Sequence, residues 1–260
     1  MLFMKYIDIH CHLNFEAFDI DRTEVIARAQ EKEVGMIVVG TNLATSEKAM
    51  KIAEENENVW AIVGLHPVEV PCEVFDIENY RKLTKSKKVV GIGECGFDYF
   101  RQGYELRDKQ REIFEAHIAL ANEIRKPLML HLRNGLNPGE NAYKDALEVL
   151  KQHAKVPGDA HFFAGNWEEG KQFLDLGFRL SFTGVITFAR DYDEVIRNTP
   201  LNMIISETDA PYVTPAPHRG ERNEPSFVME VAHTISAIRG ESQEKILPHL
   251  IDNAKKLFSI

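Results

Sequence analysis

Two histidines one residue apart are the first residues of this chain that could carry chemistry. His10 and His12 end the short, apolar, β-prone stretch 6–12. In a strand alternate side chains share a face, so both imidazoles should point the same way, and Asp8 should share that face. Imidazoles are common ligands of divalent metals, and a metal is the simplest reason to bring two of them together. The stretch therefore predicts half of a metal site.

Polar residues also mark the ends of several later apolar runs. These residues are His66, Glu94, His131 followed by Arg133, His161, and Glu207 followed by Asp209. Any one of them has an ordinary explanation, such as a turn or a hydrogen bond to the backbone. Together, so many histidines and carboxylates at the same end of their strands favour a metal centre over such explanations.

The elements that must position these residues alternate along the whole chain. Strands are expected at 6–12, 36–40, 59–66, 89–94, 127–132, 160–163, 178–182 and 203–207. Helices are expected at 22–34, 45–56 (with Thr45 as N-cap), 76–86, 105–125, 141–153, 168–176, 192–197, 226–239 and 243–258. Eight strand–helix units in 260 residues give about 32 residues a unit, which fits a repeat with short loops.

The apolar, non-alternating strands are typical of parallel strands that are buried on both faces. We therefore predict an α/β fold, a (β/α)8 TIM barrel, with residues 1–260 as a single domain. A doubly wound sheet is the alternative. In a barrel the carboxyl ends of all strands converge on one mouth, where active sites lie, so residues far apart in the chain become neighbours.

Composition limits the classes of function. The formal net charge of −9 argues against a coat protein for nucleic acid, which would carry a basic face, but not against an enzyme that meets phosphates through bound cations. Three cysteines without CxxC spacing suit a reducing compartment. With no signal peptide or membrane span in the sequence, we expect a soluble, cytoplasmic protein with no membrane partner. No obligate protein partner is evident.

Six motifs, taken in order, extend over essentially the whole chain. They are His10-Cys11-His12, Gly64-Leu65-His66-Pro67, Gly91-Ile92-Gly93-Glu94-Cys95-Gly96-Phe97-Asp98, Ser206-Glu207-Thr208-Asp209-Ala210-Pro211, Arg219-Gly220-Glu221-Arg222-Asn223-Glu224-Pro225, and Asn253-Ala254-Lys255-Lys256-Leu257-Phe258. In this ordered set the chain resembles TatD-type metal-dependent deoxyribonucleases of the amidohydrolase-like superfamily. The resemblance implies a TIM-barrel hydrolase with a two-metal site that acts on DNA.

Carried over position by position, the resemblance implies ligands from six residues: His10, His12 and Asp209 for one metal, His131 and His161 for the other, and Glu94 as the bridge. Three departures from the family pattern leave these ligands intact: Leu132, the sequence His161-Phe162-Phe163-Ala164-Gly165, and the Gly/Pro-rich segment 134–141. The segment lies at the expected barrel mouth, so the departures bear on substrate preference.

The expected ligand set, imidazole and carboxylate without thiolate, suits Zn²⁺ or Mn²⁺. Mg²⁺ remains possible but prefers shells made only of oxygen. Two such ions would activate a water for attack on a phosphodiester. We expect Asp209 to orient or deprotonate that water, and Glu207 to support the site from behind the ligands. Asp8 is a candidate for fixing an imidazole tautomer.

Four residues are expected to meet the substrate, DNA or a short oligonucleotide. Arg133 could grip a phosphate with two hydrogen bonds, and His66 could donate a proton or a hydrogen bond to the leaving group. Arg219 and Arg222 would add positive charge near the mouth. Two alternatives stay open: hydrolysis of a small amide, lactone or base on the same metal barrel, because one fold hosts many reactions, and a non-catalytic metal-binding protein.

Overall fold

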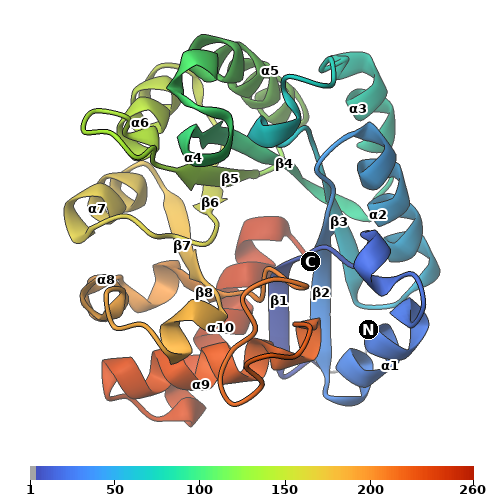
Figure 1. Ribbon diagram of the computed structural model, residues 1–260. Helices are drawn as coiled ribbons and strands as arrows, with labels where there is room; N and C mark the ends of the chain where they lie inside the picture. Colours follow the sequence, from blue (N-terminus) through green and yellow to red (C-terminus); the bar gives the residue numbers. More distant parts are fainter. Residues whose placement is uncertain (1–3) are drawn as a thin grey trace.

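Eight parallel strands form one sheet, and their order in space follows the chain (Figure 1). The computed structural model describes residues 4–260. The strands are β1 (Tyr6–Cys11), β2 (Val34–Val39), β3 (Val59–Val63), β4 (Val89–Asp98), β5 (Leu128–Arg133), β6 (Gly158–Ala160), β7 (Phe178–Phe182) and β8 (Ile204–Ser206). Each strand pairs in parallel with the next. The predicted (β/α)8 barrel is confirmed.

Helices follow the strands and cover the outside of the barrel (Figure 1). They are α1 (Arg22–Glu31), α2 (Leu43–Glu55), α3 (Ile77–Leu83), α4 (Tyr99–Gln102), α5 (Arg107–Ile124), α6 (Ala142–His153), α7 (Trp167–Asp175), α8 (Asp193–Asn198), α9 (Val228–Arg239) and α10 (Gln243–Phe258). Single 3-10 turns precede or join several of them, including η2 (Pro67–Glu69) and η4 (Gly184–Thr187). Among residues 4–260, no helix has the length and hydropathy that crossing a membrane requires.

Several bounds of the expected elements were wrong. The expected strands 59–66 and 160–163 correspond to β3 and β6, which end at Val63 and Ala160, so His66 and His161 follow their strands. Two further differences concern the start of α2 and the end of β4. The start of α2 is capped by Asn42, whose side chain accepts a hydrogen bond from the backbone N–H of Thr45, so Thr45 is the third helical residue of a capping box and not the N-cap. The fourth strand does not end at Glu94 but continues to Asp98, because residues 95–98 pair with residues 130–133 of β5. This extension carries a second carboxylate into the mouth.

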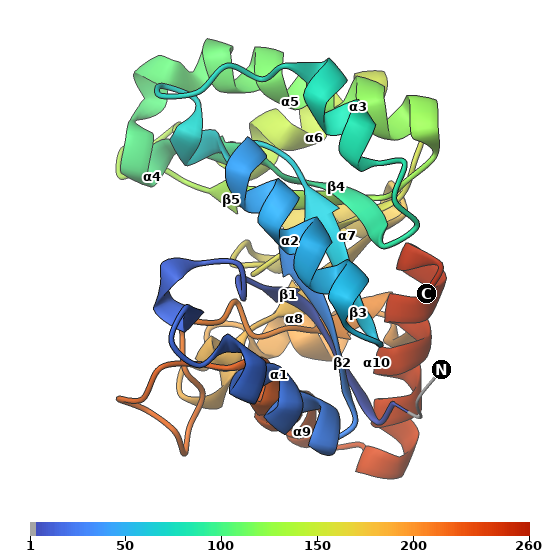
Figure 2. The same cartoon turned by 90° about the vertical axis from the view of Figure 1, so that its right-hand side faces the viewer.

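The apolar core has two layers. The larger cluster lies between the strands and the surrounding helices, and includes Val38, Val63, Leu130, Phe114 and Ile235. The smaller cluster joins side chains of several strands, among them Ile9, Ile37, Ile62, Met129 and Ile205, to Leu257 and Phe258 of α10. Figure 2 shows α10 at one end of the barrel and segments 12–21 and 211–225 at the other. Apolar packing thus closes one end and leaves the carboxyl ends of the strands for polar residues.

The first and last strands meet through side chains more than through a ladder. Within residues 4–260, β8 and β1 share only an isolated bridge between Cys11 and Ala210. The Asp8 carboxylate accepts hydrogen bonds from the Thr208 backbone N–H (2.8 Å) and the Thr208 hydroxyl (2.6 Å). The Asp209 N–H donates to the His10 carbonyl at 2.9 Å, and the His12 N–H to the Ala210 carbonyl at 2.7 Å. We call this junction of residues 8–12 with 208–210 the seam.

Candidate metal centre

Four ligand atoms from β1, β4 and the seam converge at the mouth of the barrel. His10 Nε2 lies 3.2 Å from His12 Nε2, 3.4 Å from Glu94 Oε2 and 3.8 Å from Asp209 Oδ1. His12 Nε2 lies 3.8 Å from Glu94 Oε2 and 3.4 Å from Asp209 Oδ1. Two imidazole nitrogens and two carboxylate oxygens at these separations can surround one divalent ion.

The other oxygen of Glu94 faces a second set of imidazoles. Glu94 Oε1 lies 2.7 Å from His131 Nδ1, 3.0 Å from His161 Nε2 and 3.3 Å from His66 Nε2. Glu94 is almost fully buried, so its two oxygens serve two groups of donors and nothing else in the described chain. The structure therefore brings all six expected ligands together, with Glu94 in the middle. It also brings in His66, which the sequence assigned to the substrate.

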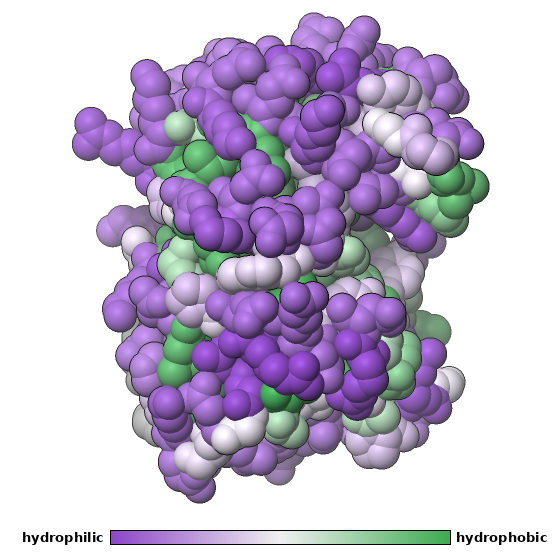
Figure 3. All heavy atoms as spheres, turned by 90° about the vertical axis from the view of Figure 1, so that its left-hand side faces the viewer, coloured by the Kyte–Doolittle hydropathy of each residue, from purple (hydrophilic) through white to green (hydrophobic). Residues whose placement is uncertain are grey.

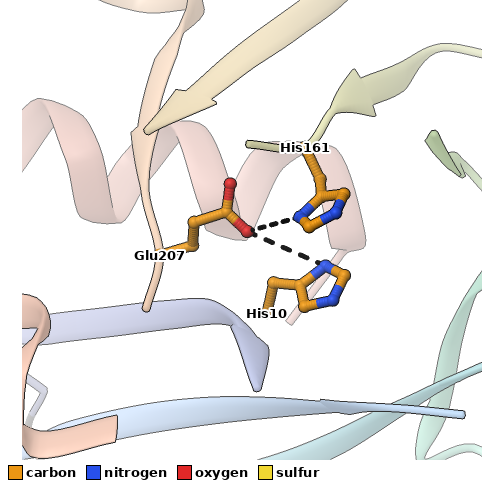
Figure 4. Close-up of side chains that lie close together, drawn as sticks. All are labelled: His10, His161 and Glu207. Atoms are coloured by element: carbon orange, nitrogen blue, oxygen red, sulfur yellow. Dashed lines mark hydrogen bonds and ion pairs between the residues drawn. The ribbon is translucent and has the colours of Figure 1, made fainter. Parts of the chain in front are cut away.

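Hydrogen bonds from behind orient two of these imidazoles, those of His12 and His161. His12 Nδ1 donates to the Val39 carbonyl at 3.0 Å, which leaves Nε2 free to bind an ion. His161 Nδ1 lies 3.0 Å from Glu207 Oε2, and the other Glu207 oxygen accepts from the Phe162 N–H and the Ser181 hydroxyl. Figure 4 shows Glu207 reaching both His161 and His10. With three such contacts, Glu207 is suited to orienting His161 rather than to binding an ion itself.

Asp98 is the site residue that sequence reasoning missed. Its carboxylate is fully buried and lies 3.0 Å from His131 Nε2, while the opposite ring nitrogen faces Glu94. The signal was present, because Asp98 lies four residues after Glu94 in the same apolar run and so shares its face. The expected strand 89–94 ends before Asp98, so its side chain was not placed with the other candidates.

Asp8 does not have the role that the alternation of β1 suggested. The register of β1 against β2 shifts between Asp8 and Cys11, so strict alternation fails there. Asp8 accepts from the backbone N–H of His10 and from Thr208, and its hydrogen bonds reach no imidazole nitrogen in the described chain. His10 Nδ1 is buried without a hydrogen bond, 3.7 Å from Glu207 Oε2. Asp8 thus holds the seam and does not fix a tautomer.

Burial and close charge oppose each other at the centre. Burial alone would raise the pKa of Glu94, but His66, His161 and His10 together hold that pKa well below its usual range. Burial likewise opposes the charge on His161, yet Glu207 and Glu94 raise the pKa of its imidazole well above the ordinary value. Burial and the neighbouring His131 lower the pKa of His66 to about 4. Glu94 is thus ionised and His66 neutral at pH 7, as metal binding requires, whereas an ion bound by His161 must displace the proton that its raised pKa retains.

The donor set fits divalent metal ions. Glu94, Glu207 and Asp209 are buried or nearly so, yet in residues 4–260 their only cationic neighbours within 4.0 Å are histidines. Buried carboxylates without a lysine or arginine are costly unless another positive charge compensates them. The atoms offered are imidazole nitrogens and carboxylate oxygens, the ligands that Zn²⁺ and Mn²⁺ accept. A bound cation would supply such a charge and leave the imidazoles neutral.

Of the residues expected to meet the substrate, His66 lies within the cluster itself, whereas the three arginines have other neighbours. Arg133 ends β5 beside Asp98 and stacks on Phe100, and Arg219 stacks on Phe188. Arg222 is held by Asp21 and by the Ala17 carbonyl, so its guanidinium already has partners in this structure. His66 Nδ1 accepts a hydrogen bond from the Val68 N–H, which points Nε2 toward Glu94.

The chain is similar to proteins of one family along almost its whole length. The family model described as TatD related DNase matches residues 7–259. The uncharacterized metal-dependent hydrolase YabD of Bacillus subtilis is 38% identical, with 97% of this chain and 98% of the relative covered. A protein of Pantoea ananatis described as 3'-5' ssDNA/RNA exonuclease TatD is 34% identical, with 97% and 99% covered. The crystal structure of YJJV, a TatD homologue of Escherichia coli, superposes with a TM-score of 0.89 at 27% identity, with both chains fully covered.

Proposed function

Because the chain belongs to the TatD family of metal-dependent hydrolases, we propose that it hydrolyses phosphodiester bonds in single-stranded DNA, from a strand end, with two divalent metal ions. The observation that carries this proposal is Glu94, whose two buried oxygens face two separate groups of imidazoles. A carboxylate so placed is suited to bridging two ions. The relative described as a single-strand exonuclease supports the choice of substrate.

His10, His12 and Asp209 would hold one ion, His131 and His161 the other, and Glu94 both. When bound, the two ions would supply an activated water and neutralise charge on the phosphate. Zn²⁺ or Mn²⁺ suits this donor set better than Mg²⁺ does.

Side chains of the protein would hold the ligands in place, bind the phosphate and transfer protons. The Asp209 carboxylate, ionised at pH 7 because His12 keeps its pKa low against the effect of burial, can accept a proton from the attacking water. Glu207 keeps the His161 ring in place through Nδ1. Arg133 can donate two hydrogen bonds to a phosphate. Neutral His66 at the rim of the second group can donate a hydrogen bond to the leaving oxygen.

The test begins with elemental analysis of the purified protein and continues with metal exchange. We expect two equivalents of metal and cleavage of an end-labelled single-stranded oligonucleotide. Asp209→Asn should lower kcat on the order of 10²–10⁴-fold, because it removes both a ligand and the proton acceptor. Asp252→Asn makes the same change of charge on the exposed side of α10 and should leave the rate unchanged.

Other outcomes would contradict the proposal. Turnover of cyclic amides or lactones with no cleavage of oligonucleotides would favour the small-molecule alternative. Full turnover in both His131→Ala and Asp209→Ala would show that the cluster is not catalytic. Protein that no divalent ion activates would exclude a metal-dependent reaction.

A further inference from the structure

The exposed apolar side chains of this protein lie at one end of the barrel. Within residues 4–260, seven large apolar side chains are more than a third exposed: Ile20, Val74, Phe100, Tyr104, Leu136, Phe188 and Tyr212. Five of them lie between the carboxyl end of a strand and the next helix, and Phe100 and Tyr104 lie in and just after the short helix α4, between β4 and α5. The flank over α6, α7 and α8, by contrast, is mostly hydrophilic (Figure 3). Exposed apolar groups collected on one functional face indicate a binding surface.

The guanidinium group of an arginine stacks on the ring of two of these side chains. Arg133 Cζ lies 4.0 Å from the centroid of Phe100, and Arg219 Cζ lies 4.1 Å from the centroid of Phe188. Both rings remain 46–47% exposed. The first pair belongs to α4 and the end of β5, and the second to the segments after β7 and β8. Figure 1 shows α4 in the upper part of the mouth and the segment after β8 in the lower part.

Neither arginine has a carboxylate partner in the described chain. Most other arginines in the described part of this acidic protein are ion-paired, as Arg107 is with Asp145 and Arg222 with Asp21. Arg133 has no acidic group within 4.0 Å, and Arg219 donates one hydrogen bond, at 2.8 Å to the Thr214 carbonyl. The stacked ring holds each guanidinium plane while most of its N–H groups stay available for an anion. A guanidinium group that is stacked but not ion-paired can bind a ligand that has both an anionic group and a flat ring.

We propose that Phe100 with Arg133, and Phe188 with Arg219, are two nucleotide subsites on different sides of the metal centre. In each subsite one unpaired base stacks on the phenyl ring or the guanidinium plane, and the arginine donates to the adjacent phosphate. The inference rests on the proposed function and adds how the strand is held. Paired bases cannot offer their faces in this way, so the subsites select single strands, and they tolerate any base because each has a π-face.

The experiment replaces one base at a time with an abasic residue along a single-stranded oligonucleotide. For the wild-type, metal-loaded enzyme we expect KM to rise roughly 5- to 150-fold at two positions, which is the usual strength of one stacked base. In Phe100→Ala one of these positions should become insensitive to loss of the base, and in Phe188→Ala the other. Leu136→Ala removes an exposed apolar side chain at the same mouth without an arginine, and should keep the wild-type pattern.

Two results would overturn the inference while the proposed function stands. One is cleavage by the wild type with the same KM at every abasic position. The other is an unchanged pattern of sensitive positions in folded Phe100→Ala and Phe188→Ala, with folding checked by thermal melting. No cleavage of any oligonucleotide would instead refute the proposed function, and the subsites with it.

Discussion

At the scale of single residues, the candidate metal centre depends on acceptors that fix three of its imidazoles. His12 is held by the Val39 carbonyl, His161 by Glu207 and His131 by Asp98. Such partners set which nitrogen carries the proton and raise the basicity of the other. Two of the three are carboxylates, so they also add charge that favours a cation. The acceptors behind the imidazoles therefore belong to this site as much as the ligands do.

Asp98 gives the residue-scale prediction. Asp98→Ala should weaken metal binding about 10- to 100-fold, because His131 loses the acceptor that orients its ring. Competition with a chromophoric chelator measures the affinity. Asp98→Asn keeps an amide oxygen that can accept from His131 Nε2, so it should recover part of the loss. Equal affinity in the wild type and a folded Asp98→Ala would contradict this role.

At the scale of elements, α5 holds the end of β3 through a buried histidine. His117 Nε2 accepts the backbone N–H of Leu65 at 2.9 Å, and Nδ1 donates to the Ile113 carbonyl at 2.7 Å. Phe75 stacks on the ring with centroids 3.9 Å apart. Leu65 directly precedes His66, so this contact fixes where the third strand delivers its histidine to the mouth.

The same contact predicts a dependence of stability on pH. Burial lowers the pKa of His117 to about 4, whereas the unfolded chain binds this proton below about pH 6.5. The contribution of neutral His117 to the free energy of unfolding is therefore complete above pH 6.5. It is lost as the pH falls toward 4, by roughly 3 kcal/mol at most. In metal-free protein, His117→Gln should lose less free energy of unfolding than the wild type between pH 7 and pH 4. Urea denaturation measures this difference, and His249→Gln, on the exposed side of α10, should behave as the wild type does.

At the scale of the whole molecule, we propose residues 1–260 as one domain, since a single sheet and its helices share continuous apolar clusters. Metal binding should then stabilise the molecule as a unit. An ion at 100 times its dissociation constant adds about 2.7 kcal/mol, which raises the melting temperature by roughly 5–10 °C.

Removal of metal by a chelator should lower the melting temperature by that amount and keep one cooperative transition in calorimetry. His10→Ala, which removes a ligand, should show a smaller difference between loaded and chelated protein. Two separate transitions would contradict the single domain, and no shift at all would contradict tight metal binding.

The sequence predicts the barrel because each strand is a continuous apolar run and most helices have clear amphipathic spacing. It predicts that His10, His12, His131 and Asp209 come together because they stand at or just beyond strand ends, which topology makes neighbours, while their assignment as ligands is what the family resemblance implies. Asp98 was missed because the length of β4 depends on pairing with β5. The stacking of Arg133 on Phe100 and of Arg219 on Phe188 depends on how loops fold over the mouth, which no local pattern encodes. Asp8 was misassigned because a shift of register in β1 breaks the alternation.

The seam has a consequence for how the protein is made. Asp8 and Thr208 are 200 residues apart, and Asp209 must meet His10 and His12 from the same distance along the chain. During synthesis the amino-terminal end is produced first, and its histidines cannot acquire their last ligand until β8 has emerged from the ribosome. The complete ligand set therefore exists only after Asp209 has been synthesised. A metal ion bound at the seam would link segments 8–12 and 208–210, which are far apart in the sequence. Because the entropy cost of bringing two segments together grows with their separation along the chain, such an ion would stabilise a contact that is costly to form.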